Sequence, residues 1–389
     1  MPAQPHRPSI AAVTLAHISV DMQTGSLVVL LPILLANFDL SYATAAAIIT
    51  ANNIVIAIAQ PLFGILGDQK SYKWMVWAGC LLCGAAMASV LFLPSYGLVI
   101  AAVILSGVGS AAFHPEGLSR VRAVSAEKVA SGTSFFFSGG NIGFALGPIV
   151  ATLLVERLGK PGALLMLVPT TLGLLALRSQ WRTIRQDAPK KARVVGGRGL
   201  GIAFGLVAFL MLLITLRSTV MSGLQAFIPL YFHETGTLSK EGAAFLVTLL
   251  AICGAAGTLS GGLLADRFGR RTTMATTMVL ALGALYFFLH TEGILRMVAI
   301  GFAGACLSAA WPIIVVMIQE AMPNNVGLAS GLSLGTSYGA TGLGVAALGS
   351  FADAFGLYST MTLLTLLPIG ILLMTLFVPE RVSKSVPQT

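Results

Sequence analysis

The sequence contains very little charge. Only 10% of its 389 residues are Asp, Glu, Lys or Arg, whereas 56% are hydrophobic. Soluble domains carry about 25% charged residues, so this composition excludes a water-soluble globular protein of this length. Most of the chain is therefore expected to lie in lipid, as an integral membrane protein.

Cysteine is scarce as well. There are four cysteines, all in apolar runs, and the CxxC spacing of Cys80 and Cys83 has no second pair or histidine to complete a zinc site. We interpret them as small packing residues. The HExxH string of zinc hydrolases is absent too. We therefore expect no enzyme, no cofactor and no bound metal.

Long apolar segments predict the architecture. The first residues, MPAQPHRPSI, lack a cleavable signal with a small-residue exit, so the first apolar stretch is expected to be retained. A membrane-spanning helix needs about 20 mostly apolar residues. Segments of that length occur at 10–37, 41–67, 73–93, 96–122, 128–156, 160–178, 201–233, 239–266, 272–290, 293–320, 325–352 and 357–378. The predicted fold is an all-α membrane protein with twelve transmembrane helices in two six-helix, pseudo-symmetric bundles.

Lysine and arginine predict the orientation. With both termini in the cytoplasm, 18 of them fall on the cytoplasmic side and 4 on the other. This is the bias of the positive-inside rule, and it explains the net charge of +9 without nucleic acid. We expect an N-terminal bundle (1–178), a basic cytoplasmic linker (179–200) that contacts lipid headgroups, and a C-terminal bundle (201–389).

The two halves repeat each other. GILGDQKSYK (64–73) aligns with GLLADRFGRR (262–271), GVGSAAFHP (107–115) with GACLSAAWP (304–312), and GNIG (140–143) with GATG (339–342). Parallel repeats of this kind place a substrate site between the halves near the bilayer midplane. The repeat favours alternating access over a fixed pore.

Ionisable residues inside spans mark the candidate site. Asp21 lies about midway along the first span, with His17 one turn before it on the same face. Arg217 lies deep in the seventh span. Such residues are costly in lipid and usually face a cavity or a partner. The repeat offset places Asp21 opposite Arg217, so we predict a charge pair or a proton–substrate switch, with a purely structural pair as the alternative.

The fourth span carries a second polar group. His114 and Glu116 are about 200° apart around a helix, so they are not expected to face one cavity unless Pro115 bends the helix. Glu116 and Arg120, four residues apart, are expected to pair. His114 is the better cavity candidate, because histidine titrates near pH 6.5; local packing is the alternative.

The loop after the second span and its copy after the eighth resemble the G-x-L-x-D-R-x-G-R-R signature of the major facilitator superfamily. The second copy is nearly complete, whereas the first has Gln69 and Ser71 in place of the arginine and the second glycine. The resemblance implies that these loops steady one conformer on the cytoplasmic side. The gating residues that it implies are Asp68, Lys73, Asp266, Arg267, Arg270 and Arg271; surface ion pairs are the alternative.

Glycines recur at helical spacing in two spans. Segment 139–148, GGNIGFALGP, resembles the superfamily's antiporter motif, and its glycines form one stripe for close helix packing. The motif is associated with export. The residues of this motif and of a second stripe are Gly139, Gly143, Gly147, Pro148, Gly331, Gly335 and Gly339.

Together HISVD (17–21), AAFHPEG (111–117) and the antiporter-type motif resemble the fosmidomycin-resistance family of efflux transporters. QPLFGILGD (60–68), QEAMP (319–323) and GLGVAALGSFAD (342–353) extend the similarity through nearly the whole chain. The resemblance implies proton-driven export of a drug from a bacterium across its cytoplasmic (inner) membrane.

The sign of the charges suggests the cargo. Arg217 and a protonated His114 would stabilise an anion such as a phosphonate, and Asp21 would carry the coupling proton. The expected partners are a small anionic or amphiphilic substrate, protons and membrane lipid, and we expect a monomer. A proton-coupled importer of an organic anion on the same fold remains the alternative. A sensor without transport would not be expected to need two gating loops.

Overall fold

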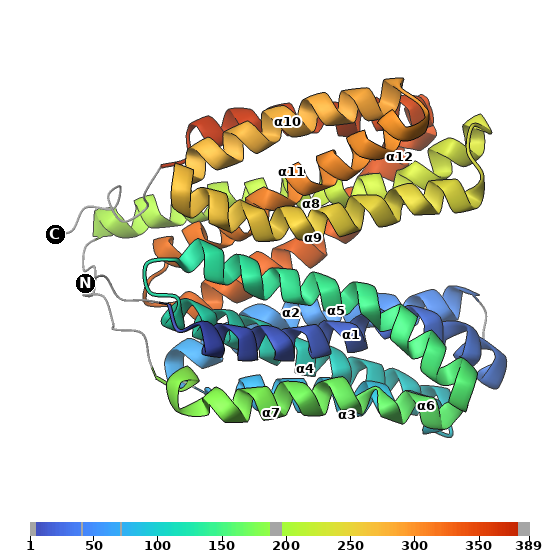
Figure 1. Ribbon diagram of the computed structural model, residues 1–389, viewed down its shortest axis with the longest axis vertical. Helices are drawn as coiled ribbons and strands as arrows, with labels where there is room; N and C mark the ends of the chain where they lie inside the picture. The colour runs from blue at the N-terminus through green and yellow to red at the C-terminus, as the bar shows by residue number, and fades with distance from the viewer. Residues whose placement is uncertain (1–4, 40–41, 71, 187–196, 380–389) are drawn as a thin grey trace. The chain divides into compact units, whose positions relative to one another are not determined.

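The computed structural model describes residues 5–39, 42–70, 72–186 and 197–379, and within these ranges the chain is helical without strands (Figure 1). The helices are α1 (Arg7–Phe38), α2 (Tyr42–Lys70), α3 (Met75–Ser89), the short 3-10 helix η1 (Val90–Phe92), α4 (Tyr96–Val124), α5 (Val129–Leu158), α6 (Lys160–Leu165), α7 (Leu167–Ile184), α8 (Gly197–Thr235), α9 (Lys240–Phe268), α10 (Arg270–His290), α11 (Gly293–Ala321) and α12 (Val326–Leu376).

The predicted count of twelve spans is not confirmed. Eleven helices in the described ranges are long and apolar enough to cross a membrane, with α6 and α7 together forming one span. The difference lies in α12, which runs through both of the last predicted spans, 325–352 and 357–378. Gly356 inside it has φ 83°, a backbone conformation that glycine adopts without steric cost. The helical geometry is therefore interrupted where the sequence predicts the boundary.

The chain forms two compact units. The first contains α1 to α7 and also Pro323–Tyr338, which includes the start of α12; the second contains α8 to α11 and α12 from Gly339 onward. The predicted linker lies largely outside the described residues, because 187–196 are not among them. The predicted bundle boundaries at 178 and 201 stay predictions.

Glycine brings α5 against α1 in the first unit. A Cβ atom on Gly143 would overlap the carbonyl group of Ile18, and one on Gly147 would overlap that of Met22. Gly139 meets Thr14 in the same way. The three glycines lie on one face of α5, and Pro148 follows them inside a helix that continues to Leu158. Small side chains thus let the two backbones touch.

The second stripe packs the start of α12 on α2, also in the first unit. Cβ atoms on Gly331 and Gly335 would overlap the backbone carbonyls of Gln60 and Ala57. For Gly339, which belongs to the second unit, no neighbour lies that close among the described residues. Two of the three predicted glycines therefore make a close helix contact here.

The second unit is built around α11. In the apolar stretch of α11 that is long enough to span a membrane, 89% of the residues are buried inside the structure. Cβ atoms on Gly257 and Gly261 of α9 would overlap the carbonyls of Ala305 and Ala309 of α11. An apolar helix buried on all sides forms the centre of its bundle.

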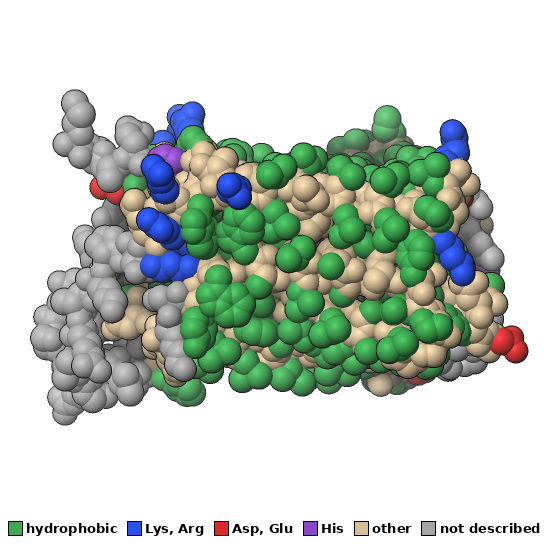
Figure 2. Space-filling model, turned by 90° about the horizontal axis from the view of Figure 1, so that it is seen from below, with side chains coloured by type: hydrophobic (Ala, Val, Ile, Leu, Met, Phe, Trp, Pro, Cys, Tyr) green, Lys and Arg blue, Asp and Glu red, His purple; other side chains and the backbone are tan. Residues whose placement is uncertain are grey.

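The outer surface matches a lipid environment. Figure 2 shows one face of the molecule, with hydrophobic side chains over its middle and Lys and Arg side chains toward its ends. Large apolar side chains are exposed along the helices, including Leu153 of α5 and Leu172 and Leu175 of α7. In water such a surface would drive aggregation, so the fold is that of an integral membrane protein.

Enlarging Gly143 tests the contact between α1 and α5. We expect Gly143→Leu to lower the free energy of unfolding by about 1–3 kcal/mol or more, because overpacking forces backbone shifts. Thermal unfolding of the purified protein in detergent measures the change. Gly283→Ala in α10 is the control, since nothing lies within 4 Å of a Cβ built there. Equal stability of both variants would contradict the packing described.

Candidate functional site

Two helices of the first unit bring ionisable side chains together. His17 and Asp21 lie one turn apart on α1, and His114 comes from α4, which continues unbroken through Pro115. Nε2 of His17 lies 3.1 Å from Oδ2 of Asp21, and Nε2 of His114 lies 3.2 Å from Oδ1 of the same carboxylate. The two Nε2 atoms are 3.0 Å apart. We call His17, Asp21 and His114 the His–Asp triad.

The other ring nitrogens of the triad are held by backbone carbonyls. Nδ1 of His17 donates to the carbonyl of Phe136 on α5, and Nδ1 of His114 donates to the carbonyl of Ser110, each over 2.7 Å. These bonds fix the orientation of both rings. Both Nε2 atoms therefore point toward Asp21.

The walls of the site exclude water from most of it. The side chains of His17 and His114 are 2% and 3% exposed, and that of Asp21 is 15% exposed. The ring of Phe136 stacks on His17 at 3.9 Å between centroids. Opposite the carboxylate, a Cβ atom on Gly140 would lie 2.5 Å from Oδ2 of Asp21. Only glycine leaves room for the triad at this position of α5.

The triad is a low-dielectric site for a small cation. Its three ligand atoms, one from each residue, lie within 4.8 Å of one another, which is close enough for one small cation to contact all three. An ionised carboxylate buried beside two imidazoles is stabilised by positive charge there. Asp21, as the most exposed member, is the one that solvent reaches.

Glu116 and Arg120 form a separate group on α4. Oε1 of Glu116 lies 2.8 Å from Nε of Arg120, and both side chains are buried. The two atoms form a close ion pair, although the N–H is not aligned for a hydrogen bond. Arg120 also donates to the carbonyl of Gln186 beyond α7 over 3.3 Å. The structure thus brings His114 to Asp21 and leaves Glu116 with Arg120, although the two lie two residues apart on α4.

Arg217 lies in the second unit, on α8. Its Nε donates to the carbonyl of Leu307 over 3.1 Å, and its Nη2 donates to the hydroxyl of Ser308 over 3.3 Å. The guanidinium also lies 5.4 Å from the ring centroid of Trp311. The described contacts of this cation are all to neutral groups of α11. Its pairing with Asp21, which lies in the other unit, stays a prediction.

Asp68, near the end of α2, caps another helix. Its carboxylate accepts hydrogen bonds from the backbone N–H groups of Gly327 and Leu328, over 2.8 and 2.7 Å. These amides begin α12, where backbone N–H groups have no partner within the helix. A carboxylate there is favoured by the helix dipole as well. Asp68 therefore ties α2 to the start of α12 within the first unit.

Arg270, the first residue of α10, contacts α11. Arg270 makes a bidentate ion pair with the carboxylate of Glu320 on α11, at 2.5 and 2.8 Å. Asp266 and Arg267 are exposed at the end of α9. Lys73 lies in the turn before α3, and Arg271 lies in the first turn of α10.

Sequence reasoning missed three parts of the site. It did not foresee that His17 bonds directly to His114, nor that backbone amides would be the partners of Asp68. The third missed part is the pair of Arg270 with Glu320, a largely buried residue of QEAMP (319–323). The sequence signal for it was an acidic residue near the end of an apolar span. Backbone partners leave no trace in the sequence.

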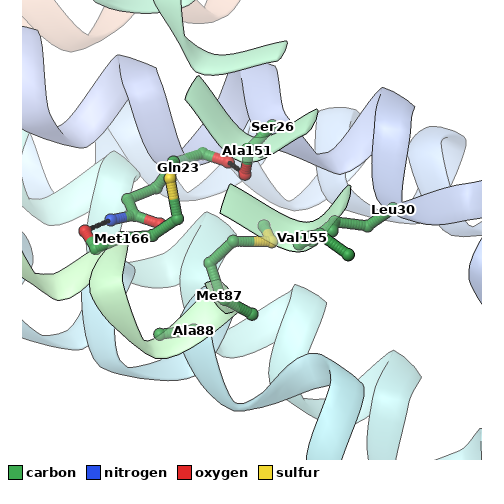
Figure 3. A pocket seen from close by; sticks show the side chains of 9 residues that line it. Gln23, Ser26, Leu30, Met87, Ala88, Ala151, Val155 and Met166 are labelled. Atoms are coloured by element: carbon green, nitrogen blue, oxygen red, sulfur yellow. Dashed lines mark hydrogen bonds between the residues drawn. The ribbon is translucent and has the colours of Figure 1, made fainter. Parts of the chain in front are cut away.

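A narrow packing gap lies in the first unit. Figure 3 shows it between Gln23, Met87, Ala151, Val155 and Met166. It leaves no room for a water molecule. The gap is therefore not a substrate site.

Comparison with known proteins identifies the family of the chain. A family model described as Major Facilitator Superfamily matches residues 13–239 and 210–389. The chain is similar to the fosmidomycin resistance protein of Escherichia coli (strain K12), with 27% identity covering 96% of this chain and 93% of that protein. It is also similar to the multidrug efflux pump LfrA of Mycolicibacterium smegmatis, with 29% identity over 43% of this chain and 34% of that protein.

Solved structures share the fold. The fucose:proton symporter FucP of E. coli superimposes with a TM-score of 0.74 and 15% identity, covering 95% of this chain and 98% of that chain. At this identity the likeness concerns the fold alone.

Neutralising Asp68 tests the helix cap. We expect Asp68→Asn to lower the free energy of unfolding by about 1.5–3 kcal/mol, the usual worth of hydrogen bonds to a charged group. Hydrogen exchange at the amides of Gly327 and Leu328 should become faster, because an amide side chain offers only one acceptor oxygen. Asp353→Asn on exposed α12 surface is the matched control. Unchanged exchange in Asp68→Asn would contradict the cap.

Breaking the buried pair on α4 tests whether Glu116 and Arg120 depend on each other. Removing one partner of a buried ion pair typically costs about 3–5 kcal/mol, so Glu116→Gln and Arg120→Met should each destabilise strongly. The double variant should lose clearly less than the two losses added together. Denaturant unfolding in mixed micelles measures this, with exposed Glu156→Gln as control. Additive losses would show that the pair is not coupled.

Proposed function

Because the chain belongs to the major facilitator superfamily, a family of transporters rather than enzymes, we propose that it is a proton-coupled antiporter that exports a drug or small organic anion by alternating access. The observation that carries the proposal is the His–Asp triad, a buried ionisable cluster midway along a spanning helix. Ionisable groups at that depth are costly and mark proton and substrate pathways.

Similarity to resistance proteins supports the direction of transport. The E. coli relative is named for fosmidomycin resistance and the M. smegmatis relative for multidrug efflux. We propose a fosmidomycin-like cargo, that is, a small anion such as a phosphonate. The protein would work as a monomer in the cytoplasmic membrane of a bacterium, with both termini in the cytoplasm.

Arg217 supports an anionic cargo. Its described contacts are a carbonyl, a hydroxyl and an aromatic ring, so its charge remains available for an anion. Guanidinium groups suit phosphonate and carboxylate because they offer paired N–H donors. We propose that Arg217 binds the anion when the triad is protonated, and that an ionised Asp21 competes for Arg217 when the proton has left.

The helix cap at Asp68 supports a gating role. Two charge-assisted hydrogen bonds hold the start of α12 on α2, and they are lost together if the two helices separate. We propose that this contact stabilises one conformer of the transport cycle. The glycine stripes of α5 and α12 would provide the close-packed surfaces on which helices shift.

An importer that carries an organic anion together with protons is the second candidate. It shares the fold, as the similarity to a fucose:proton symporter illustrates. The sign of the pH gradient that drives uptake distinguishes the two functions.

Transport in inside-out membrane vesicles tests the proposal. Fosmidomycin uptake should rise when the vesicle lumen is made acidic, since protons then leave as the drug enters. Asp21→Asn, His114→Ala and Arg217→Ala should each reduce uptake by about tenfold or more, as expected for losing an ionisable group at midmembrane depth.

Asp353→Asn is the control and should transport normally. Uptake that requires an acidic exterior instead would establish the importer. Full activity in all three site variants would remove the site proposed here.

A further inference from the structure

We propose that the coupling proton is shared between the imidazoles of His17 and His114, on their facing Nε2 atoms, and that Asp21 stays ionised as the counter-charge. The inference rests on the proposed function, because this proton has a role in transport only if protons drive the transport. In this proposal the two histidines carry the coupling proton, whereas the sequence suggested that Asp21 carries it.

The bonds behind each ring decide where its own hydrogen lies. Nδ1 of His17 and Nδ1 of His114 each contact a backbone carbonyl oxygen at 2.7 Å. A carbonyl oxygen only accepts, so both Nδ1 atoms carry a hydrogen. A neutral imidazole has a single N–H, and each ring when neutral therefore presents a bare lone pair at Nε2.

Two bare lone pairs cannot face each other at this distance without repulsion. The Nε2 atoms are 3.0 Å apart, which is the ordinary length of a hydrogen bond between nitrogen donors and their acceptors. One added proton turns the contact into an N–H···N bond and makes one ring an imidazolium. The spacing of the rings is thus the spacing of a shared proton.

A proton on Asp21 would leave more of the close contacts between acceptor atoms without a hydrogen. A protonated carboxyl could donate to only one Nε2, and the other Nε2 would still face two acceptors, its partner ring and the second carboxylate oxygen. With the proton on the rings, the carboxylate lies 3.1 and 3.2 Å from the two Nε2 atoms. It then neutralises the imidazolium, so the buried group has no net charge, which lowers the cost of burial.

The surrounding helices offer no other cation to the carboxylate among their described side chains. The thiol of Cys83 on α3 and the phenol of Tyr338 on α12 are close enough to Asp21 to interact with it electrostatically, and neither is positive. The charged side chains described on α2, α4, α5 and α7 lie in the pair on α4 or toward helix ends: Asp68, Glu116, Arg120, Arg122, Glu156, Arg157, Arg178 and Arg182.

Loss of the proton would have a structural consequence. Without it three acceptors converge in a site that water hardly reaches, and the triad carries one negative charge. The repulsion would loosen the link between α1 and α4 and turn Asp21, the most exposed member, toward a cation elsewhere. His17 is then as necessary for coupling as Asp21, although only Asp21 is charged at all times.

Nuclear magnetic resonance of the full protein in lipid bilayers, with histidine nitrogens labelled, tests this directly. At neutral pH we expect a nitrogen–nitrogen coupling across the bond between the two Nε2 atoms, both Nδ1 atoms protonated, and the carboxyl carbon of Asp21 at the shift of a carboxylate. The remaining histidines, His6, His233 and His290, serve as internal references. His17→Gln should abolish the coupling, and it should lose proton-driven uptake as completely as Asp21→Asn.

Several results would overturn the inference. A protonated Asp21 beside two neutral rings would move the proton to the carboxyl and leave the proposed function intact. Binding of one Zn²⁺ per protein that is lost in His17→Gln, with no nitrogen–nitrogen coupling in the metal-free protein, would assign the triad to a metal. A shared proton in a protein without any proton-driven flux would overturn the coupling role and the proposed function together.

Discussion

Lipid cannot hydrate a charge, and this constraint decides the arrangement of the polar groups in this protein. Several ionisable groups described within the helices find partners inside the protein. The triad joins α1 to α4, Glu116 pairs with Arg120, Arg270 pairs with Glu320, and Asp68 takes backbone amides. Because each partner is close and largely buried, these contacts also specify which helices lie together.

Packing and charge depend on each other at α5. The carbonyl of Phe136 reaches His17 only because α5 approaches α1 closely, and the glycines of α5 permit that approach. Gly140 leaves the space in which the triad sits, whereas Gly143 and Gly147 let the backbones touch. A stripe that predicts close packing from sequence therefore also orients an imidazole, since any larger side chain would push the carbonyl away.

The first copy of the repeated motif shows what the motif leaves open. Asp68 lies against the start of α12, where free backbone N–H groups donate to its carboxylate. That helix terminus lies more than 250 residues further along the chain. In the second copy of the motif, Arg270 pairs with Glu320. The motif marks where these residues lie along their helices, and the tertiary structure supplies their partners.

Composition and apolar run lengths by themselves predicted a membrane protein and the depth of Asp21, His17 and His114, since these follow from local hydrophobicity and spacing. The i,i+4 pairing of Glu116 and Arg120 was predictable for the same reason. The superfamily was indicated by the resemblance of the repeated motif at 64–73 and 262–271. Tertiary structure alone decided that His17 faces His114 at 3.0 Å and that Asp68 caps α12. It also showed that Gly356 interrupts the helical geometry between the last two predicted spans. Contacts between distant helices depend on the rotation of each helix about its axis and on backbone partners. Residue types alone specify neither of these.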